Sequence, residues 1–64
     1  MENKIKEYRQ ALGMTQEELS EKANCTARAI RNYEAGKQLP RLDILVNIAA
    51  ALETSVIYLI GETN

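Results

Sequence analysis

The chain has 64 residues, of which 45% are hydrophobic and 27% charged, and its net charge is −1. A chain of this length folds around one small core, so we expect a single domain over residues 1–64. It contains no histidine and a lone cysteine, Cys25. This composition excludes an internal disulfide, the common metal-ligand clusters and the usual nucleophile–base pairs, so we expect neither an enzyme, nor a cofactor, nor a metal site.

Hydropathy excludes a membrane-spanning or secreted chain. No apolar run approaches the roughly 20 residues that cross a bilayer, and the first residues, Met1 to Ile5, lack the apolar stretch of a signal peptide. The lone cysteine fits a reducing compartment. We therefore expect a cytoplasmic protein with no membrane partner.

The charges are unevenly distributed along the chain. Residues 22–41 include five basic residues and one acidic residue, Glu34, for a local charge of +4, which leaves −5 for the remainder. One basic segment in an acidic chain indicates a single anion-binding surface and favours nucleic acid as the partner. An uneven scatter by chance is the alternative.

A first helix is predicted at about residues 2–12. Ile5, Tyr8 and Leu12 form an apolar stripe with helical spacing, and Gly13 follows where a helix ends in the left-handed conformation. Neither here nor further along does the sequence alternate apolar and polar residues as a half-buried strand would. The chain is therefore predicted to be all-helical.

Two short helices separated by a tight turn come next. Thr15 and Glu18 form a capping-box pattern that starts a helix at residue 16, and Asn24 ends it because asparagine tolerates the left-handed conformation. Thr26 can cap the following helix, at about 27–35. Residues 16–35 thus form a helix-turn-helix, whose second helix can enter the major groove of DNA.

Two more helices complete the predicted bundle. Between about residues 42 and 52, leucine, isoleucine and alanine recur with the spacing of a core helix. Ser55 can cap a last short helix over about residues 56–60, which Gly61 would close. The sequence therefore predicts five short helices.

The helix at 27–35 has two different faces. At 100° per residue, Ile30, Tyr33 and Glu34 share the side that faces the core. The other face carries Arg28, Arg31, Asn32 and Ala35. Arginine and asparagine suit bidentate contacts with guanine and adenine edges respectively, whereas a solvated helix face is the alternative.

The same residues resemble the helix-turn-helix of phage repressors, Cro proteins and bacterial XRE-type regulators. The resemblance covers essentially the whole chain, and its main positions are Thr15-Gln16-Glu17-Glu18-Leu19, Cys25-Thr26, Ile30, Tyr33-Glu34, Gly36 and Pro40. It implies an all-α fold, a compact five-helix bundle of the lambda-repressor type, that binds double-stranded DNA.

Roles for individual residues follow from this resemblance. It implies base contacts from Ala27, Arg28 and Asn32, with Arg31 able to take a base or a phosphate. It implies phosphate contacts from the start of the second helix, the cap of the third and the loop after it, namely Gln16, Thr26, Lys37, Gln38 and Arg41. Gln16 would also brace the third helix, and Arg9 and Glu34 would form a structural ion pair. Each of these roles has an alternative. Gln16 could be a plain polar residue at a helix start, and Thr26 could act as a cap alone. Ala27 could reflect simple helix propensity, and the loop could be an ordinary solvated surface.

Several positions depart from the family pattern. Asn24 and Glu53 stand where glycine is frequent, and Cys25, where valine is preferred, is expected to act as a small buried hydrophobe. Ile57 and Tyr58 stand where many members carry charged residues, and as an exposed apolar patch they indicate an association surface. We hypothesise a two-fold homodimer through the last helix.

The function expected from these features is transcription regulation. The favoured hypothesis is a homodimeric repressor that occupies an operator with two inverted half-sites, with the helix at 27–35 in the major groove. Its occupancy could be controlled by a separate regulatory protein partner. The alternative is a protein-interaction module, antitoxin-like or binding an anti-repressor, in which DNA binding is secondary.

Overall fold

The computed structural model describes residues 3–60, and every element within that range is a helix. The helices are α1 (Ile5–Ala11), α2 (Gln16–Ala23), α3 (Ala27–Glu34), α4 (Leu42–Ala51) and α5 (Val56–Ile60). The all-helical expectation is confirmed. Residue 2, the expected start of the first helix, and Gly61, the expected end of the last, lie outside the described residues.

The first helix is shorter than the sequence predicts, because residues 3 and 4 make other contacts. The Asn3 side chain accepts a hydrogen bond from the Ile5 amide at 3.1 Å and donates one to the Tyr33 carbonyl at 2.8 Å. The Lys4 amide donates to the Leu59 carbonyl at 2.7 Å. These bonds tie the segment before α1 to α3 and α5, so the helix begins only at Ile5.

The capping signals act as expected. The Thr15 hydroxyl accepts from the Glu18 amide at 3.0 Å while the Thr15 amide donates to the Glu18 carboxylate at 2.8 Å, which completes the capping box of α2. Asn24 follows α2 with φ 63° and ψ 47°, the left-handed conformation. Ser55 accepts from the Tyr58 amide at 3.3 Å and caps α5.

The helices surround one core, to which each contributes a side chain with almost no exposure. These side chains are Ile5, Leu19, Ile30, Ile48 and Leu59, one from each helix in order. Burying such a side chain stabilises the fold by about 1.5–3 kcal/mol. Five helices of ten residues or fewer, each too short to be stable alone, therefore depend on a shared core.

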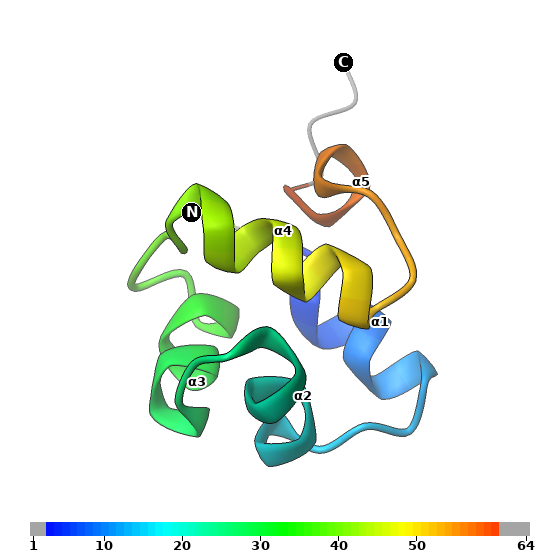
Figure 1. The fold of residues 1–64 in the computed structure, drawn as a ribbon, viewed down its shortest axis with the longest axis horizontal. Helices are drawn as coiled ribbons and strands as arrows, with labels where there is room; N and C mark the ends of the chain where they lie inside the picture. Colours follow the sequence, from blue (N-terminus) through cyan, green and yellow to red (C-terminus); the bar gives the residue numbers. More distant parts are fainter. Residues whose placement is uncertain (1–2, 61–64) are drawn as a thin grey trace.

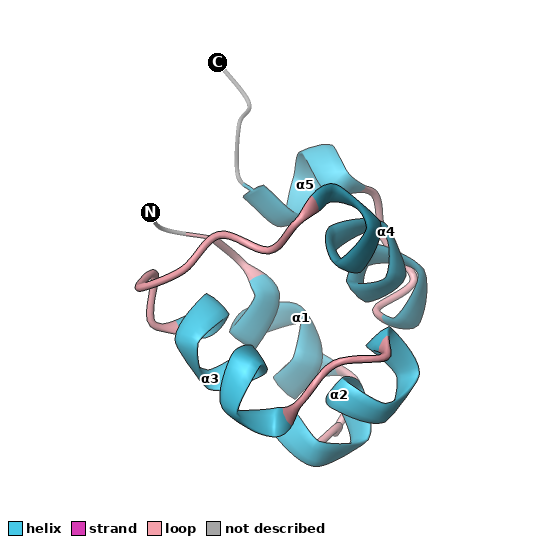
Figure 2. Cartoon of the chain, turned by 60° about the vertical axis from the view of Figure 1, so that its left-hand side comes forward, coloured by secondary structure: helices cyan, strands magenta, loops and turns pink. Residues whose placement is uncertain are grey.

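The arrangement leaves one side of the bundle to the helix-turn-helix. In Figure 1, α4 runs across the middle, with α2 and α3 on one side of it and α5 on the other. The second helix packs against both α3 and α4, and α1 packs against α3 and α5. The Asn47 side chain on α4 donates to the Ala23 carbonyl at the end of α2 at 3.1 Å. Figure 2 shows the chain from a second side, with α3 and the loop before α4 brought forward. This packing fixes α3 from behind and leaves its other face open.

Candidate nucleic-acid interface

The turn between α2 and α3 sets the direction of α3. It consists of Asn24, Cys25 and Thr26, and the Cys25 amide donates to the Ser20 carbonyl at 3.0 Å to close the end of α2. The Thr26 hydroxyl accepts from the Ala29 amide at 3.0 Å and caps α3. The side chain of Thr26 is exposed, so the cap stands at the surface where α3 begins.

The two faces of α3 differ as its sequence predicts. Ile30 and Tyr33 are buried. Arg28, Arg31 and Ala35 are exposed, whereas Ala27 and Asn32 are half-buried. Two guanidinium groups and one amide thus lie together along the open side of an eight-residue helix, and these groups can form paired hydrogen bonds with base edges.

A single carboxylate joins three helices behind this surface. Glu34 at the end of α3 lies 2.6 Å from Arg9 Nε on α1, and its second oxygen accepts from Arg9 Nη2 at 3.2 Å and from Gln16 Nε2 on α2 at 3.0 Å. The side chains of Arg9 and Glu34 are 10% and 5% exposed. Arg9 Nη1 also donates to the Met14 carbonyl at 2.8 Å. The Arg9–Glu34 ion pair is therefore part of the structure and fixes α3 relative to α1 and α2.

Gln16 has hydrogen-bonding capacity left after bracing Glu34. Its side-chain amide carries two N–H donors, and one of them serves the Glu34 contact. Gln16 is the first residue of α2 and is half-buried. The brace to Glu34 and a contact with an outside acceptor are thus compatible.

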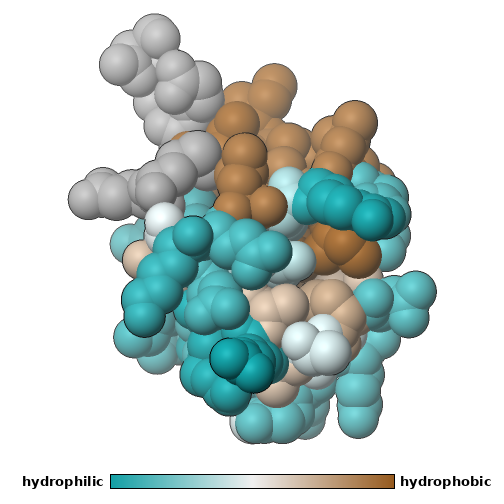
Figure 3. Space-filling view, turned by 90° about the vertical axis from the view of Figure 1, so that its left-hand side faces the viewer, coloured by the Kyte–Doolittle hydropathy of each residue, from teal (hydrophilic) through white to brown (hydrophobic). Residues whose placement is uncertain are grey.

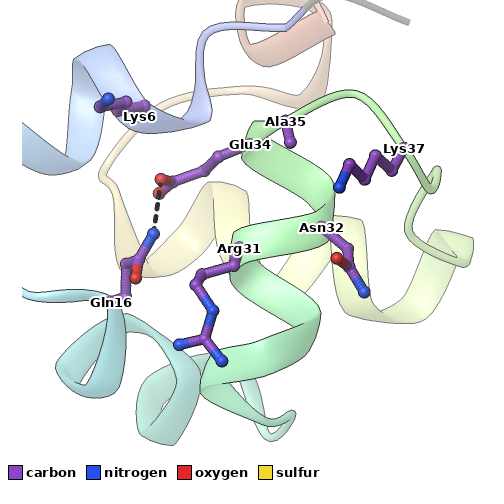
Figure 4. Close-up of a pocket in the computed structure, with 7 residues that line it drawn as sticks. All are labelled: Lys6, Gln16, Arg31, Asn32, Glu34, Ala35 and Lys37. Carbon is purple, nitrogen blue, oxygen red and sulfur yellow. Dashed lines mark hydrogen bonds between the residues drawn. The ribbon is translucent and has the colours of Figure 1, made fainter.

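An open hollow of about 400 Å³ lies between α1 and the outer side of α3. Figure 4 shows its lining, which we call the basic hollow because three of its side chains are cations: Lys6, Arg31, Lys37, together with Gln16, Asn32, Glu34 and Ala35. Four residues that the sequence assigns to DNA contacts, Gln16, Arg31, Asn32 and Lys37, therefore line one depression.

The loop after α3 carries the remaining expected phosphate contacts. Lys37 and Gln38 are exposed, and the Lys37 amide donates to the Asn32 carbonyl at 3.0 Å. Arg41 is exposed but already engaged: its guanidinium donates to the Asp43 carboxylate at 2.9 and 3.3 Å. The hydrogen-bonded Arg41 lowers the pKa of the Asp43 carboxyl. Arg41 can therefore meet a phosphate only by sharing or leaving Asp43.

The molecular surface separates polar from apolar regions. Figure 3 views the α3 side, where hydrophilic residues surround a weakly hydrophobic patch in the lower part and the most hydrophobic residues gather at the upper end. On α5, Ile57 is 62% exposed and Tyr58 is 58% exposed. The apolar patch expected at these positions is thus present, on the opposite side of α4 from the helix-turn-helix.

Residues 3–60 contain neither a metal-binding cluster nor a membrane-spanning helix. No group of three histidine, cysteine or carboxylate side chains in this range could hold a metal ion. Among these same residues, no helix has the length and apolar character to cross a membrane. Cys25, expected to be a small buried hydrophobe, lies in the turn, where it is half-buried and packs against the core. This burial raises the pKa of its thiol.

The sequence reasoning missed Lys6. Its signal was available: Lys6 and Arg9 are three residues apart on α1 and so share a side of that helix. Because Arg9 pairs with Glu34 on α3, Lys6 had to lie near the same end of α3. Asn3 and Asn47, which brace α3 and α2 through backbone carbonyls, carry no comparable signal in the sequence.

Comparison with known proteins agrees with this geometry. The profile of the family described as Helix-turn-helix matches residues 5–59. An uncharacterized HTH-type transcriptional regulator of Methanothermobacter thermautotrophicus is 42% identical over 52 residues, which are 81% of this chain and 75% of that protein. The cryptic phage CTXphi transcriptional repressor RstR of Vibrio cholerae is 36% identical over 63 residues, or 92% of this chain and 56% of the repressor. The chain thus spans only part of these relatives.

Two solved structures of SinR share the fold. A complex of SinR with SinI superimposes with a TM-score of 0.83 at 34% identity, over 91% of this chain and 57% of that one. SinR described as the master regulator for biofilm formation, in complex with DNA, gives a TM-score of 0.75 at 34% identity, over 81% of this chain and 84% of that one.

Proposed function

Because this chain belongs to the XRE-type helix-turn-helix family of DNA-binding transcriptional regulators, we propose that it is a repressor that binds an inverted-repeat operator as a homodimer. The observation that carries this proposal is the open face of α3, with exposed Arg28 and Arg31 beside Asn32. In this proposal α3 enters the major groove, and the protein works in the cytoplasm, where its DNA target lies.

Base reading is assigned to the open face of α3. Arg28 is the principal reader because its guanidinium is exposed and can bond both acceptors of a guanine edge. Asn32 suits an adenine edge, Ala27 a thymine methyl group, and Arg31 either a base or a phosphate. Arg9 and Glu34 hold α3 at a fixed angle from behind and touch no DNA.

Phosphate contacts are assigned to the residues around α3. Gln16 has a free amide N–H, Thr26 stands exposed at the start of α3, and Lys37 and Gln38 are exposed in the following loop. Arg41 also contacts a phosphate, while its guanidinium keeps a hydrogen bond to the Asp43 carboxylate. Such contacts fix the register of the protein on the duplex and carry no sequence information themselves.

Dimerisation is assigned to α5. Ile57 and Tyr58 are more than half exposed on a five-residue helix whose Leu59 is buried in the core. A second copy that covers these side chains would present two α3 helices to half-sites about one helical turn apart. The position of α5 across α4 from the helix-turn-helix leaves both open faces free.

A regulatory protein partner is a second element of the proposal. The similarity to a transcriptional repressor of Vibrio cholerae supports repression. The SinR–SinI complex, whose SinR chain shares this fold, supports control of DNA binding by a protein partner. A module that served only protein binding would be expected to carry apolar residues on the open face of α3, where arginine and asparagine stand instead.

The first test is selection of bound sequences from a random duplex library, followed by fluorescence anisotropy on the winning sequence at two salt concentrations. We expect an enriched inverted repeat with tight binding that an unrelated duplex does not compete away. Absence of enrichment, with only weak salt-sensitive binding, would reject sequence-specific regulation and support the protein-interaction module.

The dimer has its own test. Analytical ultracentrifugation of the wild type and of Ile57→Lys, free and on the selected duplex, should show a dimer for the wild type that the substitution weakens. Thr54→Lys, which adds the same charge just before α5, is the matched control. A wild type that stays monomeric even on DNA would remove the homodimer from the proposal.

A further inference from the structure

We propose that the basic hollow seats one phosphate of the DNA backbone and that Lys6, on α1, is one of its ligands. The inference rests on the proposed function and extends its DNA interface beyond the helix-turn-helix, which begins only at Gln16. The three cations that line the hollow come from separate elements: Lys6 from α1, Arg31 from α3 and Lys37 from the loop after α3.

These three cations are available for an anion. All three are exposed, and none forms an ion pair with an acidic side chain among residues 3–60, where the pairs are Lys4–Glu7, Arg9–Glu34 and Arg41–Asp43. In Figure 4, Lys6 lies on one side of the hollow, with Arg31 and Lys37 on the opposite helix and loop. A group seated between them would meet positive charge from more than one direction.

The one carboxylate in the hollow does not oppose an anion there. Glu34 receives two hydrogen bonds from the Arg9 guanidinium, at 2.6 and 3.2 Å, so its charge is balanced from behind. Gln16 covers the other side of the carboxylate with a 3.0 Å hydrogen bond. The remaining N–H of the Gln16 amide is then a neutral donor beside the three cations.

The volume and openness of the site favour a backbone phosphate over a buried ligand. The hollow of about 400 Å³ is open to solvent beside the face of α3 that would enter the groove. A phosphodiester next to the major groove can reach such a depression while the duplex stays outside. Of the two roles open to Arg31, a base contact and a phosphate contact, the basic hollow favours the second. A guanidinium that binds a phosphate contributes affinity rather than base selectivity.

The test measures the salt dependence of binding to the selected duplex for Lys6→Gln and Lys4→Gln. Both remove one positive charge from the same end of the chain, but Lys4 lies outside the hollow and faces Glu7 at 3.8 Å. The slope of log K against log salt concentration is negative, and losing one phosphate contact reduces its magnitude by about 0.9. We expect that reduction for Lys6→Gln, with similar weakening on the operator and on unrelated DNA, and a nearly unchanged slope for Lys4→Gln.

Arg31→Gln provides the second arm. We expect it to reduce the magnitude of the slope, as Lys6→Gln does, and to leave the preferred sequence unchanged in a repeated selection. A wild-type slope for Lys6→Gln, with the operator still bound selectively, would overturn the phosphate seat alone. A wild type without any selective binding would overturn the proposed function instead. Circular dichroism melting of each variant serves as the control that its fold is intact.

Discussion

Gln16 and Glu34 are joined by a 3.0 Å hydrogen bond that connects the first residue of α2 to the last residue of α3. The turn between these helices fixes the position of α3 relative to α2 at one end of α3, and this hydrogen bond fixes it at the other end. The same carboxylate oxygen also accepts from Arg9 Nη2 on α1. The angle of α3 is therefore held by side chains that lie behind its open face.

The first prediction concerns the stability of this junction. Glu34→Ala leaves the Arg9 guanidinium, 10% exposed, without its charge partner, and breaking a buried pair from one side costs about 3 kcal/mol. Urea unfolding should show a loss of that size. Glu34→Gln, which keeps the shape and one acceptor, should lose less, and Glu17→Ala on the exposed side of α2 should change little. Unaltered unfolding of Glu34→Ala would mean that the pair contributes nothing in solution.

A second prediction separates base reading from folding. Arg28→Ala should weaken specific binding by about 1–3 kcal/mol and relax the preference at one base position. Its thermal stability should stay close to wild type, because Arg28 is exposed. Competition titrations with single-base variants of the operator measure the effect. Arg28→Lys keeps the charge but not the bidentate geometry, so it should recover affinity without selectivity. Wild-type selectivity in Arg28→Ala would move the reading role to another residue.

A third prediction follows from the backbone after α4. Glu53 has φ 59°, a left-handed conformation that costs a residue with a Cβ about 1–2 kcal/mol. Glu53→Gly should relieve much of this cost and raise the melting temperature by about 4–8 °C per kcal/mol gained. Glu53→Ala should not, since it keeps the Cβ. Asn24→Gly, at φ 63°, should gain less because asparagine tolerates this region. Equal melting for Glu53→Gly and Glu53→Ala would contradict the strain.

A fourth prediction concerns the reactivity and pH response of Cys25. Burial raises the pKa of its thiol, so less of it is thiolate than in an unfolded peptide. Reaction with a disulfide reagent over about pH 8 to 10, which brackets the ordinary thiol pKa of about 8.5, should be slower for the folded protein than in urea. The folded state holds the thiol proton more tightly, so stability should fall as pH rises from the ordinary pKa toward the raised one. Equal rates in both states would refute the protection.

Much of this fold could be predicted because its signals are local. Thr15 with Glu18, Thr26, and Asn24 mark helix ends through contacts within four residues, and each acts in the structure as its type suggests. The inward side of α3 also follows from helix geometry alone, since Ile30 is fully buried. The pairing of Arg9 with Glu34, 25 residues apart, is not readable from spacing and came from the family resemblance.

What could not be predicted depends on contacts between distant segments. The late start of α1 arises from the Asn3 bond to Tyr33 and the Lys4 bond to Leu59, 30 and 55 residues away. The spacing of Lys6 to Arg9 places Lys6 near α3 only in combination with the Arg9–Glu34 pair, and its place in the basic hollow depends on the packing of α1 beside α3. The Arg41–Asp43 pair is local in sequence, yet its competition with phosphate becomes visible only in the side-chain geometry.

The bond between the Lys4 amide and the Leu59 carbonyl has a practical consequence for work with this protein. The last helix has five residues, too few to persist by itself, and this bond is one of the contacts that hold it. An affinity tag or a deletion that displaces the beginning of the chain would therefore loosen the apolar surface of α5. In the proposed dimer such a change would alter self-association. It would also remove the Asn3 bond to the Tyr33 carbonyl of α3, while the junction of α3 with α1 and α2 at Glu34 stayed in place.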